Sequence, residues 1–331
     1  MNIAVLDDYQ DTIRTLACYS KMAGHQVTIW KDHTKDPDVL AERLKDVEAV
    51  TLLRERTPLR APLLERLDKL RLISQVGVFP HIDVEACTRR GIILSSSQMP
   101  GRPSYATAEL TWGLVIAALR RIPQEMAALR SGRWQAYPIG TGLRGKTLGI
   151  YGYGKIGSVV AGYGKAFGMN VIVWGRQTTM EKARADGHAL ARSRKIFFSN
   201  SDVVSLHVRL VPETRGMVTA ADLALMKPTA VMVNTSRAGL IAPGALEAAL
   251  RAGRPGLAAV DVFEEEPVLG AQHPLLALDN CVCVPHLGYV ERDGLEQMFS
   301  TIFDQILAYA GGKPINVMNP EMRQASARAK V

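Results

Sequence analysis

Three short segments in the second half of the chain carry side chains suited to acid–base and anion chemistry. Arg237 lies in NTSRAG, Glu266 in DVFEEEP and His286 in VPHLG. Each segment follows an apolar run that is typical of a strand, and open α/β sheets bind their ligands at the carboxyl ends of strands. The sequence therefore predicts that these three side chains form one active site.

These residue types match the reversible reduction of a 2-oxo acid. A guanidinium presents a planar fork of donors and stays charged at working pH, so Arg237 can hold the carboxylate and carbonyl oxygens. An imidazole titrates near neutrality, so His286 can exchange the alcohol proton, while Glu266 would fix its tautomer and favour its protonated form. No side chain carries hydride, so this chemistry needs a cofactor.

A site for that cofactor is predicted upstream. The apolar run 146–151 leads into the glycine turn 152–157 (GYGKIG), which is followed by a helix-like stretch through 167 and a second strand at 171–174. The glycines would allow a tight turn, close approach of the backbone to a pyrophosphate and close packing of helix on strand. The pyrophosphate would lie at the N-terminus of the helix.

Together, these motifs resemble the D-isomer-specific 2-hydroxyacid dehydrogenases, the group that includes phosphoglycerate and glyoxylate/hydroxypyruvate dehydrogenases. The segments 205–207 (SLH) and 212–216 (PETRG), and Ala108-Glu109 at the start of an apolar helix, are also similar, and the resemblance covers about 70–319. It implies that Arg237, Glu266 and His286 are catalytic, and that Asp261 faces the nicotinamide amide.

The expected binding residues fall into two groups. The cofactor-binding residues are Gly152, Gly154, Lys155, Ile156, Gly157, Gly175, Arg176, His207, Thr235 and Asp261. The substrate-binding residues are Arg54, Val76, Gly77 and Arg237. Two of these have an alternative reading, since His207 could instead cap a strand end and Arg54 could pair on the surface with Glu55.

The chain departs from the family pattern at two places. The substrate loop 75–83 contains Phe79 and Pro80 where the family usually has smaller or polar residues, so the shape of the acid pocket cannot be copied from other members. After Trp174, dinucleotide sites usually place an acidic residue that binds the ribose hydroxyls, whereas this chain has Gly175 and Arg176. An arginine without that carboxylate favours a 2′-phosphate, so NADP(H) is the favoured cofactor and NAD(H) the alternative.

The predicted fold class is α/β, with two Rossmann-like doubly wound parallel-sheet domains and an active-site cleft between them. The expected strands of the first domain are 3–6, 26–30, 49–53, 71–75 and 92–95. The Pro/Gly stretch 98–103 then indicates a crossing, and a helix at 292–310 would return to the first domain. This gives a discontinuous substrate domain, 1–98 plus 288–331, and a dinucleotide-binding domain, 99–287.

Composition narrows the possible partners. With 331 residues, 47% of them hydrophobic, the chain can bury two cores, and its longest apolar helix is too short to cross a bilayer. The start lacks the pattern of a signal peptide, so we expect a cytoplasmic protein that does not bind membranes.

The net charge of +8 is scattered, which favours anionic ligands over nucleic acid. The four cysteines form no CxxC pair and indicate no metal site or disulfide.

The sequence also predicts a homodimer and leaves one alternative function open. The apolar helix 109–119 would bury surplus surface on a two-fold partner, so a homodimer is expected. The alternative to an enzyme is a non-catalytic NAD(P)-sensing binding protein on the same fold, because fold does not determine function. The presence of all three catalytic groups favours the enzyme, since a sensor has no evident use for an acid–base group.

Overall fold

The computed structural model describes residues 1–97 and 105–321, so the predicted crossing at 98–103 lies outside the described residues. By its internal contacts the chain divides into two compact units. One comprises Met1–Gly101 and Glu291–Val331, and the other comprises Arg102–Val290. The predicted domain limits, and the predicted cleft between the domains, stay predictions.

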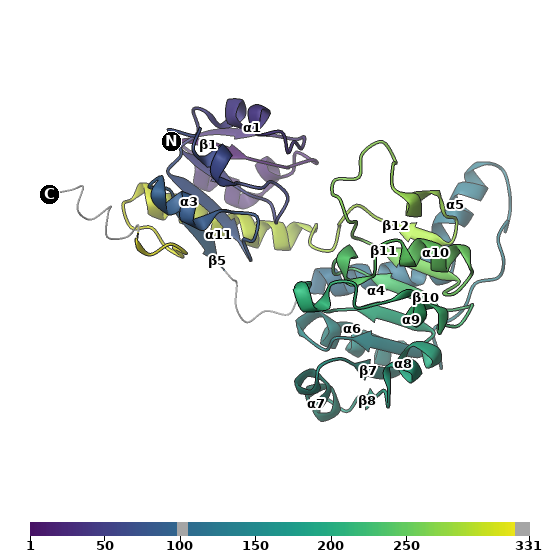
Figure 1. The fold of residues 1–331 in the computed structure, drawn as a ribbon. Coiled ribbons are helices and arrows are strands. Elements are labelled where there is room, and N and C mark those ends of the chain that lie inside the picture. Colours follow the sequence, from purple (N-terminus) through teal and green to yellow (C-terminus); the bar gives the residue numbers. More distant parts are fainter. Residues whose placement is uncertain (98–104, 322–331) are drawn as a thin grey trace. The chain divides into compact units, whose positions relative to one another are not determined.

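The first unit is built on a five-stranded parallel sheet with the order β2-β1-β3-β4-β5 (Figure 1). Its strands are β1 (Asn2–Val5), β2 (Gln26–Ile29), β3 (Ala49–Thr51), β4 (Leu72–Val76) and β5 (Ile93–Ser97). Its helices are α1 (Pro37–Leu44), α2 (Ala61–Leu64), α3 (Val84–Arg89) and α11 (Arg292–Ala310), with short 3-10 helices η1 (Ile13–Thr15) and η2 (Ala17–Met22). From β1 the chain first adds β2 on one side and then β3 on the other, so the sheet order has a switch point between β1 and β3. Open α/β sheets bind their ligands at such a point.

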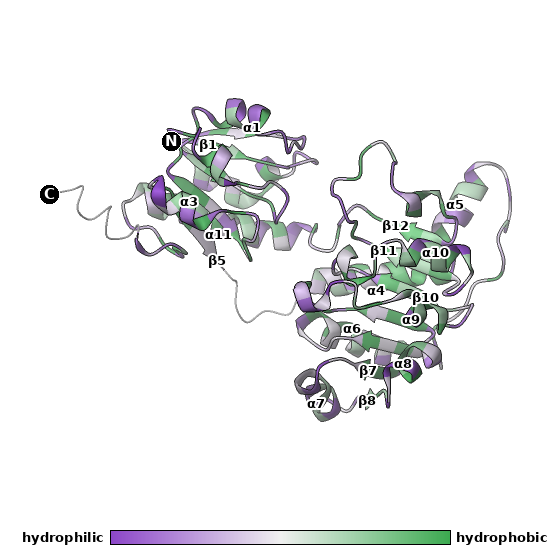
Figure 2. Cartoon of the chain, in the orientation of Figure 1, coloured by the Kyte–Doolittle hydropathy of each residue, from purple (hydrophilic) through white to green (hydrophobic). Residues whose placement is uncertain are grey.

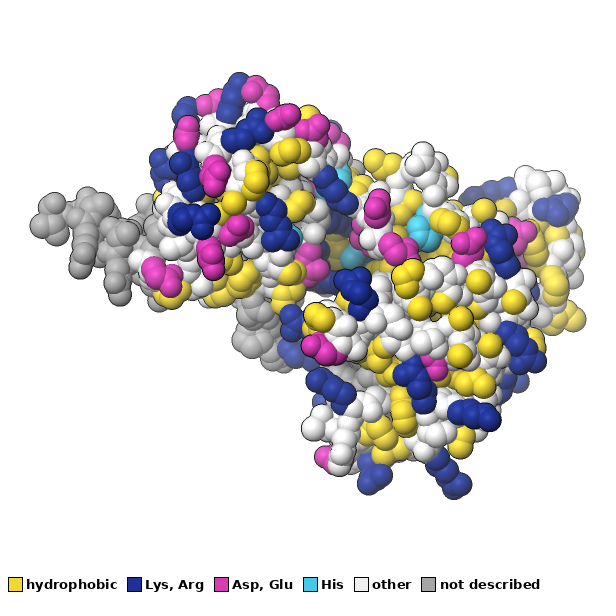
Figure 3. Space-filling model, viewed as in Figure 1, with side chains coloured by type: hydrophobic (Ala, Val, Ile, Leu, Met, Phe, Trp, Pro, Cys, Tyr) yellow, Lys and Arg dark blue, Asp and Glu magenta, His cyan; other side chains and the backbone are white. Residues whose placement is uncertain are grey.

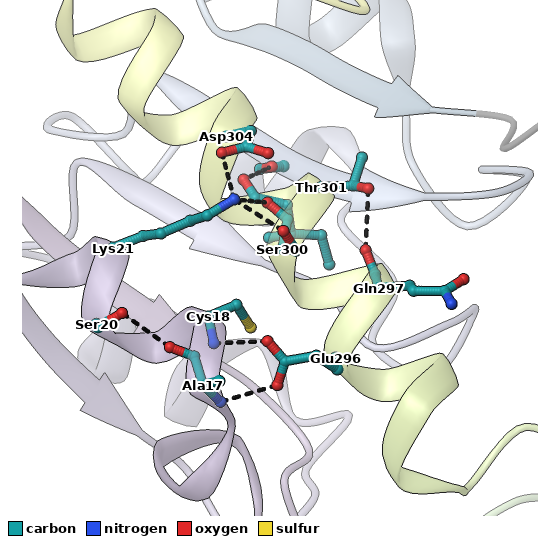
Figure 4. Close-up of polar contacts among 11 residues, drawn as sticks. Ala17, Cys18, Ser20, Lys21, Glu296, Gln297, Ser300, Thr301 and Asp304 are labelled. Carbon is teal, nitrogen blue, oxygen red and sulfur yellow. Dashed lines mark hydrogen bonds and ion pairs between the residues drawn. The ribbon is translucent and has the colours of Figure 1, made fainter.

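The C-terminal helix α11 is fastened to the N-terminal part of the first unit (Figure 4). Both carboxylate oxygens of Glu296 accept hydrogen bonds from the start of η2, from the amide of Ala17 at 2.8 Å and that of Cys18 at 2.6 Å. Lys21 of η2 forms an ion pair with Asp304 at 2.6 Å. Helix α11 also packs on β4, with Phe299 and Phe303 fully buried. These contacts make residues far apart in sequence one folding unit.

The second unit contains a seven-stranded parallel sheet with the order β12-β11-β10-β9-β6-β7-β8. The strands are β6 (Thr147–Tyr151), β7 (Asn170–Trp174), β8 (Ala189–Leu190), β9 (Val203–Leu206), β10 (Val231–Asn234), β11 (Leu257–Val260) and β12 (Cys281–Cys283). The helices are α4 (Tyr105–Leu119), α5 (Ile122–Arg130), α6 (Lys155–Ala166), α7 (Gln177–Ala185), α8 (Arg194–Asn200), α9 (Ala220–Ala224) and α10 (Ala245–Arg251), and the 3-10 helices are η3 (Pro212–Thr214), η4 (Ala238–Leu240) and η5 (Pro274–Ala277). Its switch point lies between β6 and β9.

Alternate residues along these strands enter two hydrophobic cores, one on each face of the sheet. Leu148 and Ile150 of β6 pack with α4 and α6, whereas Tyr151 packs with Phe197 and Phe198 of α8. The strands are accordingly hydrophobic and the outer faces of the helices hydrophilic (Figure 2). Parallel sheets that are covered on both faces have this pattern. The predicted fold class, two parallel-sheet α/β domains, is confirmed.

Helix α4 bears on one premise of the sequence analysis. Most of its apolar side chains are buried within the unit, because the helix packs on α6 and on strands β10, β11 and β12, whereas Leu110, Ile116 and Ala117 are half-buried. Trp112 is buried and its indole Nε1 donates a hydrogen bond to the carbonyl of Val160 at 3.1 Å. The apolar character of α4 therefore reflects mainly its packing within the unit, and the predicted burial of this helix on a two-fold partner stays a prediction. Among the described residues, no helix is both long and apolar enough to cross a membrane.

Candidate active site

The glycine turn between β6 and α6 has the geometry expected for a phosphate cradle. Gly152 has a φ of +92°, and a Cβ atom at Gly157 would lie 2.2 Å from the carbonyl oxygen of Gly152, so only glycine fits at 157. A Cβ at Gly154 would meet no atom within 4 Å, so the backbone is open there. Helix α6 begins next to it, at Lys155 and Ile156, without a side-chain cap. Its free amides fit a dinucleotide pyrophosphate.

Two neighbouring strand ends lie against this turn. A Cβ at Gly152 would lie 2.6 Å from the carbonyl oxygen of His207, and one at Gly175 would lie 3.6 Å from the Cα of Gly152. Arg176 follows as the exposed N-cap of α7. The structure thus gathers these predicted cofactor residues from β6, β7 and β9 at one edge of the sheet.

His207 is held as a neutral imidazole. Its Nε2 lies 2.9 Å from the hydroxyl of Ser205, and burial lowers the pKa of His207 to about 3. It therefore cannot supply positive charge to a phosphate at neutral pH, although it can line the turn.

The predicted catalytic pair is formed in the structure. Nδ1 of His286 lies 2.5 Å from Oε2 of Glu266, whose other oxygen accepts a hydrogen bond from the amide of Phe263 at 3.0 Å. The ring of Tyr289 meets the imidazole edge to face, with the centroids 5.6 Å apart. Because Nδ1 is engaged by the carboxylate, Nε2 is the nitrogen that can exchange a proton with a substrate.

Arg237 lies at the end of β10, next to the strands that carry this pair. The carboxyl end of β10 precedes Arg237, that of β11 precedes Glu266, and that of β12 precedes His286, and the three strands are neighbours in the sheet. Asn234 braces the arginine turn, because its side chain donates to the carbonyl of Arg237 at 2.9 Å and accepts from the amide of Ser236 at 3.0 Å. Sequence reasoning assigned no role to Asn234, although it is the first residue of the quoted motif.

Asp261 fastens the segment that follows His286. Its fully buried carboxylate accepts hydrogen bonds from the amide of Leu287 at 2.6 Å and that of Gly288 at 2.8 Å. Burial raises the pKa of Asp261 to about 6, although the two amides oppose this shift. The side chain thus sets the left-handed backbone of His286, whose φ is +52°. The predicted contact of Asp261 with the nicotinamide amide stays a prediction.

The titration of Asp261 should be visible in the stability of the protein. Its folded pKa, about 6, lies above the ordinary value of 3.8, so its contribution is complete below the ordinary value and is lost as pH rises through about 6. An asparagine does not titrate. We therefore expect the unfolding temperature of the wild type to fall, relative to that of Asp261→Asn, between pH about 4 and about 6. A difference that is constant over this range would contradict the assignment.

The remaining predicted binding residues are Thr235 in the second unit and three residues of the first unit. The Thr235 hydroxyl lies 2.9 Å from that of Thr111 on α4, so it is engaged within the protein. Arg54 follows β3 with a φ of +61°, Val76 ends β4, and Gly77 follows with a φ of +102°, so all three lie at the carboxyl edge of their sheet. Their contacts with cofactor or substrate stay predictions.

Residues of the predicted substrate loop, and two of the cysteines, pack within the protein. Phe79, one of the departures from the family pattern, packs against the core of the first unit. His81 is buried, and burial lowers its pKa to about 4. The sulfur atoms of Cys281 and Cys283 lie 3.6 Å apart on one face of β12, as predicted. Within residues 1–97 and 105–321, no cluster of ligating side chains could hold a metal ion.

Comparison with known proteins places this geometry in a family. Residues 112–288 match the family model described as "D-isomer specific 2-hydroxyacid dehydrogenase, NAD binding domain". The chain is 40% identical to the glyoxylate reductase of Aeropyrum pernix, over 90% of this chain and 91% of that protein. It is 39% identical to the D-3-phosphoglycerate dehydrogenase of Methanocaldococcus jannaschii, over 85% of this chain and 53% of that protein.

Solved structures give the same answer. The chain superimposes on a crystal structure from Ralstonia solanacearum with a TM-score of 0.92 and 50% identity, over 97% of this chain and 98% of that one. These findings confirm the predicted class of activity, hydride transfer between a nicotinamide cofactor and a 2-hydroxy acid/2-oxo acid pair. The chain belongs to the D-isomer specific 2-hydroxyacid dehydrogenase family.

Proposed function

We propose that the protein is an NADPH-dependent reductase of a small 2-oxo acid, with Arg237, Glu266 and His286 as its catalytic residues. The observation that carries the proposal is the hydrogen bond between Nδ1 of His286 and Glu266, 2.5 Å long, on strand ends that neighbour β10, the strand whose carboxyl end precedes Arg237. A bound nicotinamide supplies the hydride. The chain must therefore hold the acid, polarise its carbonyl and deliver one proton.

The proton is assigned to Nε2 of His286. Glu266 holds the other ring nitrogen and its negative charge favours the imidazolium, which can then protonate the carbonyl oxygen as that oxygen becomes an alcohol. In the oxidative direction the neutral imidazole takes the proton back. Asp261, which follows β11, holds the backbone after His286 through the amides of Leu287 and Gly288, and the ring of Tyr289 packs against the imidazole.

Binding of the substrate carboxylate and of its carbonyl oxygen is assigned to Arg237. A guanidinium matches the carboxylate of the substrate in charge and shape, and it stabilises the charge that develops on the carbonyl oxygen. The bracing by Asn234 supports this role, because a restrained turn keeps the guanidinium in one orientation.

The choice of NADPH is supported by the surroundings of Gly175. This residue lies beside the glycine turn and itself carries no carboxylate that would repel a 2′-phosphate, and Arg176 follows it at the N-terminus of α7. A helix N-terminus and a guanidinium both favour a phosphate group. NAD(H) remains the alternative.

A substrate panel tests the proposal. Relatives named glyoxylate reductase support a small acid. We expect the wild type to oxidise NADPH with at least one of glyoxylate, hydroxypyruvate, pyruvate and bulkier 2-oxo acids. Tight binding of NADPH without turnover of any acid would favour the alternative, an NAD(P)-sensing binding protein.

We also propose a cytoplasmic homodimer, with α5 and the segment after it as the dimer surface. Ile122, Met126 and Leu129 follow one face of α5 at helical spacing, and Leu129 is 58% exposed. Trp134 and Ile139 continue this surface with exposures of 78% and 100%. Apolar side chains are visible at this edge of the second unit, with basic side chains beside them (Figure 3).

A charge placed on this surface should separate the subunits. We expect the wild type to sediment as a dimer at micromolar concentration and Leu129→Glu to sediment largely as a monomer, because a buried, unpaired carboxylate opposes association. Leu269→Glu is the matched control, since Leu269 is 69% exposed and lies outside α5 and the segment after it. A monomeric wild type would overturn this proposal, as would equal effects of the two substitutions.

A further inference from the structure

A buried polar cluster lies at the carboxyl edge of the sheet in the first unit. Oδ1 of Asp7, just after β1, lies 2.7 Å from Nδ1 of His33, which lies in the segment after β2. The hydroxyl of Thr57, in the segment after β3, donates to the other oxygen of Asp7, also at 2.7 Å. Asp7 and Thr57 are each 2% exposed. Three neighbouring strand ends therefore meet at one carboxylate.

The position of this cluster in the sheet is unusual for a purely structural contact. Strands β1 and β3 flank the switch point of the sheet order, where doubly wound sheets bind ligands. Asp7 and Arg54, which follow these strands, are both in the left-handed region, with φ values of +63° and +61°. Non-glycine residues rarely adopt this backbone, and such strain gathers at functional sites.

The chemistry of the cluster also favours function over simple stability. Burying a carboxylate carries a desolvation cost, so an apolar side chain of similar size would usually stabilise the fold at least as well. Among the described residues, Nδ1 of His33 contacts the Asp7 carboxylate, while Nε2 of His33 is buried without a hydrogen-bond partner. The neighbouring Asp8 has a separate role, since it accepts from the amides of Thr12 and Ile13 at the start of η1.

The cluster connects directly to the turn that carries Arg54. Thr57 is the third residue after Arg54, and its hydroxyl fixes the end of that turn to Asp7. The guanidinium of Arg56, in the same turn, stacks on the ring of Tyr9 at 4.8 Å. The turn is thus held at two points by the segment that follows β1.

We propose that Asp7, His33 and Thr57 are positioning residues, which hold the Arg54 turn in the conformation that binds the carboxylate end of the 2-oxo acid. His33 orients the Asp7 carboxylate through its Nδ1 contact, and that carboxylate accepts the hydrogen bond of Thr57. The inference rests on the proposed function, because it assigns a substrate contact to Arg54. Removing the Thr57 hydroxyl should therefore weaken binding of the acid without altering proton delivery or cofactor binding.

The test compares Thr57→Val and Thr57→Ser with the wild type, using NADPH and the acid of the panel that the wild type reduces fastest. A hydrogen bond to a charged group is lost in the valine variant, so its KM for the acid should rise by about tenfold or more. We expect kcat and the Kd for NADPH to stay within about twofold of the wild type. The serine variant retains the hydroxyl and should restore the wild-type KM.

Thr219→Val is the matched control. The Thr219 hydroxyl donates to the largely buried carboxylate of Asp222 at 2.8 Å, which is the same kind of contact, but it caps α9 in the second unit. This variant should lose stability without a change in KM. An unchanged KM in Thr57→Val, or an equal rise in Thr219→Val, would overturn the proposal.

His33 provides a second test if Thr57→Val does not fold. His33→Asn keeps a donor near the position of Nδ1 and should retain most of the affinity for the acid, whereas His33→Leu should raise KM as Thr57→Val does. Equal KM values in these two variants would contradict the inference. A wild type that reduces no 2-oxo acid would instead overturn the proposed function, so the two failures are distinguishable.

Discussion

Replacing His286 by alanine should lower kcat by about 10²–10⁴-fold, the usual contribution of a positioned general acid. The Kd for NADPH should stay close to that of the wild type, because the glycine turn and α6 do not depend on this imidazole. Arg237→Ala should also remove most turnover, by about 10²–10³-fold, because it removes the charge that stabilises the developing oxyanion. Stopped-flow and steady-state rates with the best acid of the panel, together with NADPH titrations, measure both effects.

The second unit contains a matched control for this result. His273 and Glu264 form another histidine–glutamate pair, with Nε2 and Oε2 2.9 Å apart, only a short distance away in sequence. His273→Ala should leave kcat within about threefold of the wild type, since that pair is not assigned to the reaction. Glu266→Gln should lower kcat less than His286→Ala does, because the amide can still contact Nδ1 of His286 while the proton-transferring ring remains. A His286→Ala variant with wild-type kcat would contradict the assignment.

The cofactor preference should reverse when the charge beside the glycine turn is changed. Gly175→Asp combined with Arg176→Ser removes a guanidinium and adds a carboxylate, so the ratio of kcat/KM for NADPH to kcat/KM for NADH should fall by about 100-fold or more. The reason is that one charged contact to the 2′-phosphate is lost while the new carboxylate repels that phosphate and can bind the ribose hydroxyls. This ratio is measured for the wild type and for the double variant, at saturating 2-oxo acid.

Crowding at residue 175 requires its own control. A Cβ atom there would lie 3.1 Å from the hydroxyl oxygen of Thr179, which is a tight contact with a side chain. Gly175→Ala introduces the same Cβ without charge, and we expect it to affect NADPH and NADH alike. If the wild type already prefers NADH, the role given to Arg176 is wrong, while the roles of Arg237, Glu266 and His286 are unaffected.

Local sequence patterns predicted the parts of the site that depend on one strand and the turn after it. The glycine turn at 152–157 and the pair of Glu266 with His286 were both expected, because the carboxyl ends of parallel strands meet at one edge. The hydrophobic runs likewise predicted the five strands of the first sheet, and β6 and β7 of the second, to within a few residues. Such features need only the local pattern and the rule that adjacent parallel strands share an edge.

The remaining features depend on contacts between distant residues. The Asp7 carboxylate meets His33 and Thr57 across 26 and 50 residues, and these contacts follow from the order and register of β1, β2 and β3. The role of Asp261 as the acceptor for Leu287 and Gly288 depends in the same way on the pairing of β11 with β12. The sequence pattern of α4 could not distinguish a buried helix from a helix at a subunit interface, since both are apolar.

Isotope transfer tests the central claim most directly. NADPH that carries deuterium at C4 on the transferable face is incubated with the wild type and the best 2-oxo acid of the panel, and the product is analysed by mass spectrometry and chiral chromatography. We expect the D-2-hydroxy acid with one deuterium at C2, formed by the wild type and by His273→Ala but at least about 100-fold more slowly by His286→Ala. A wild type that binds the labelled cofactor but transfers no deuterium to any acid would contradict it.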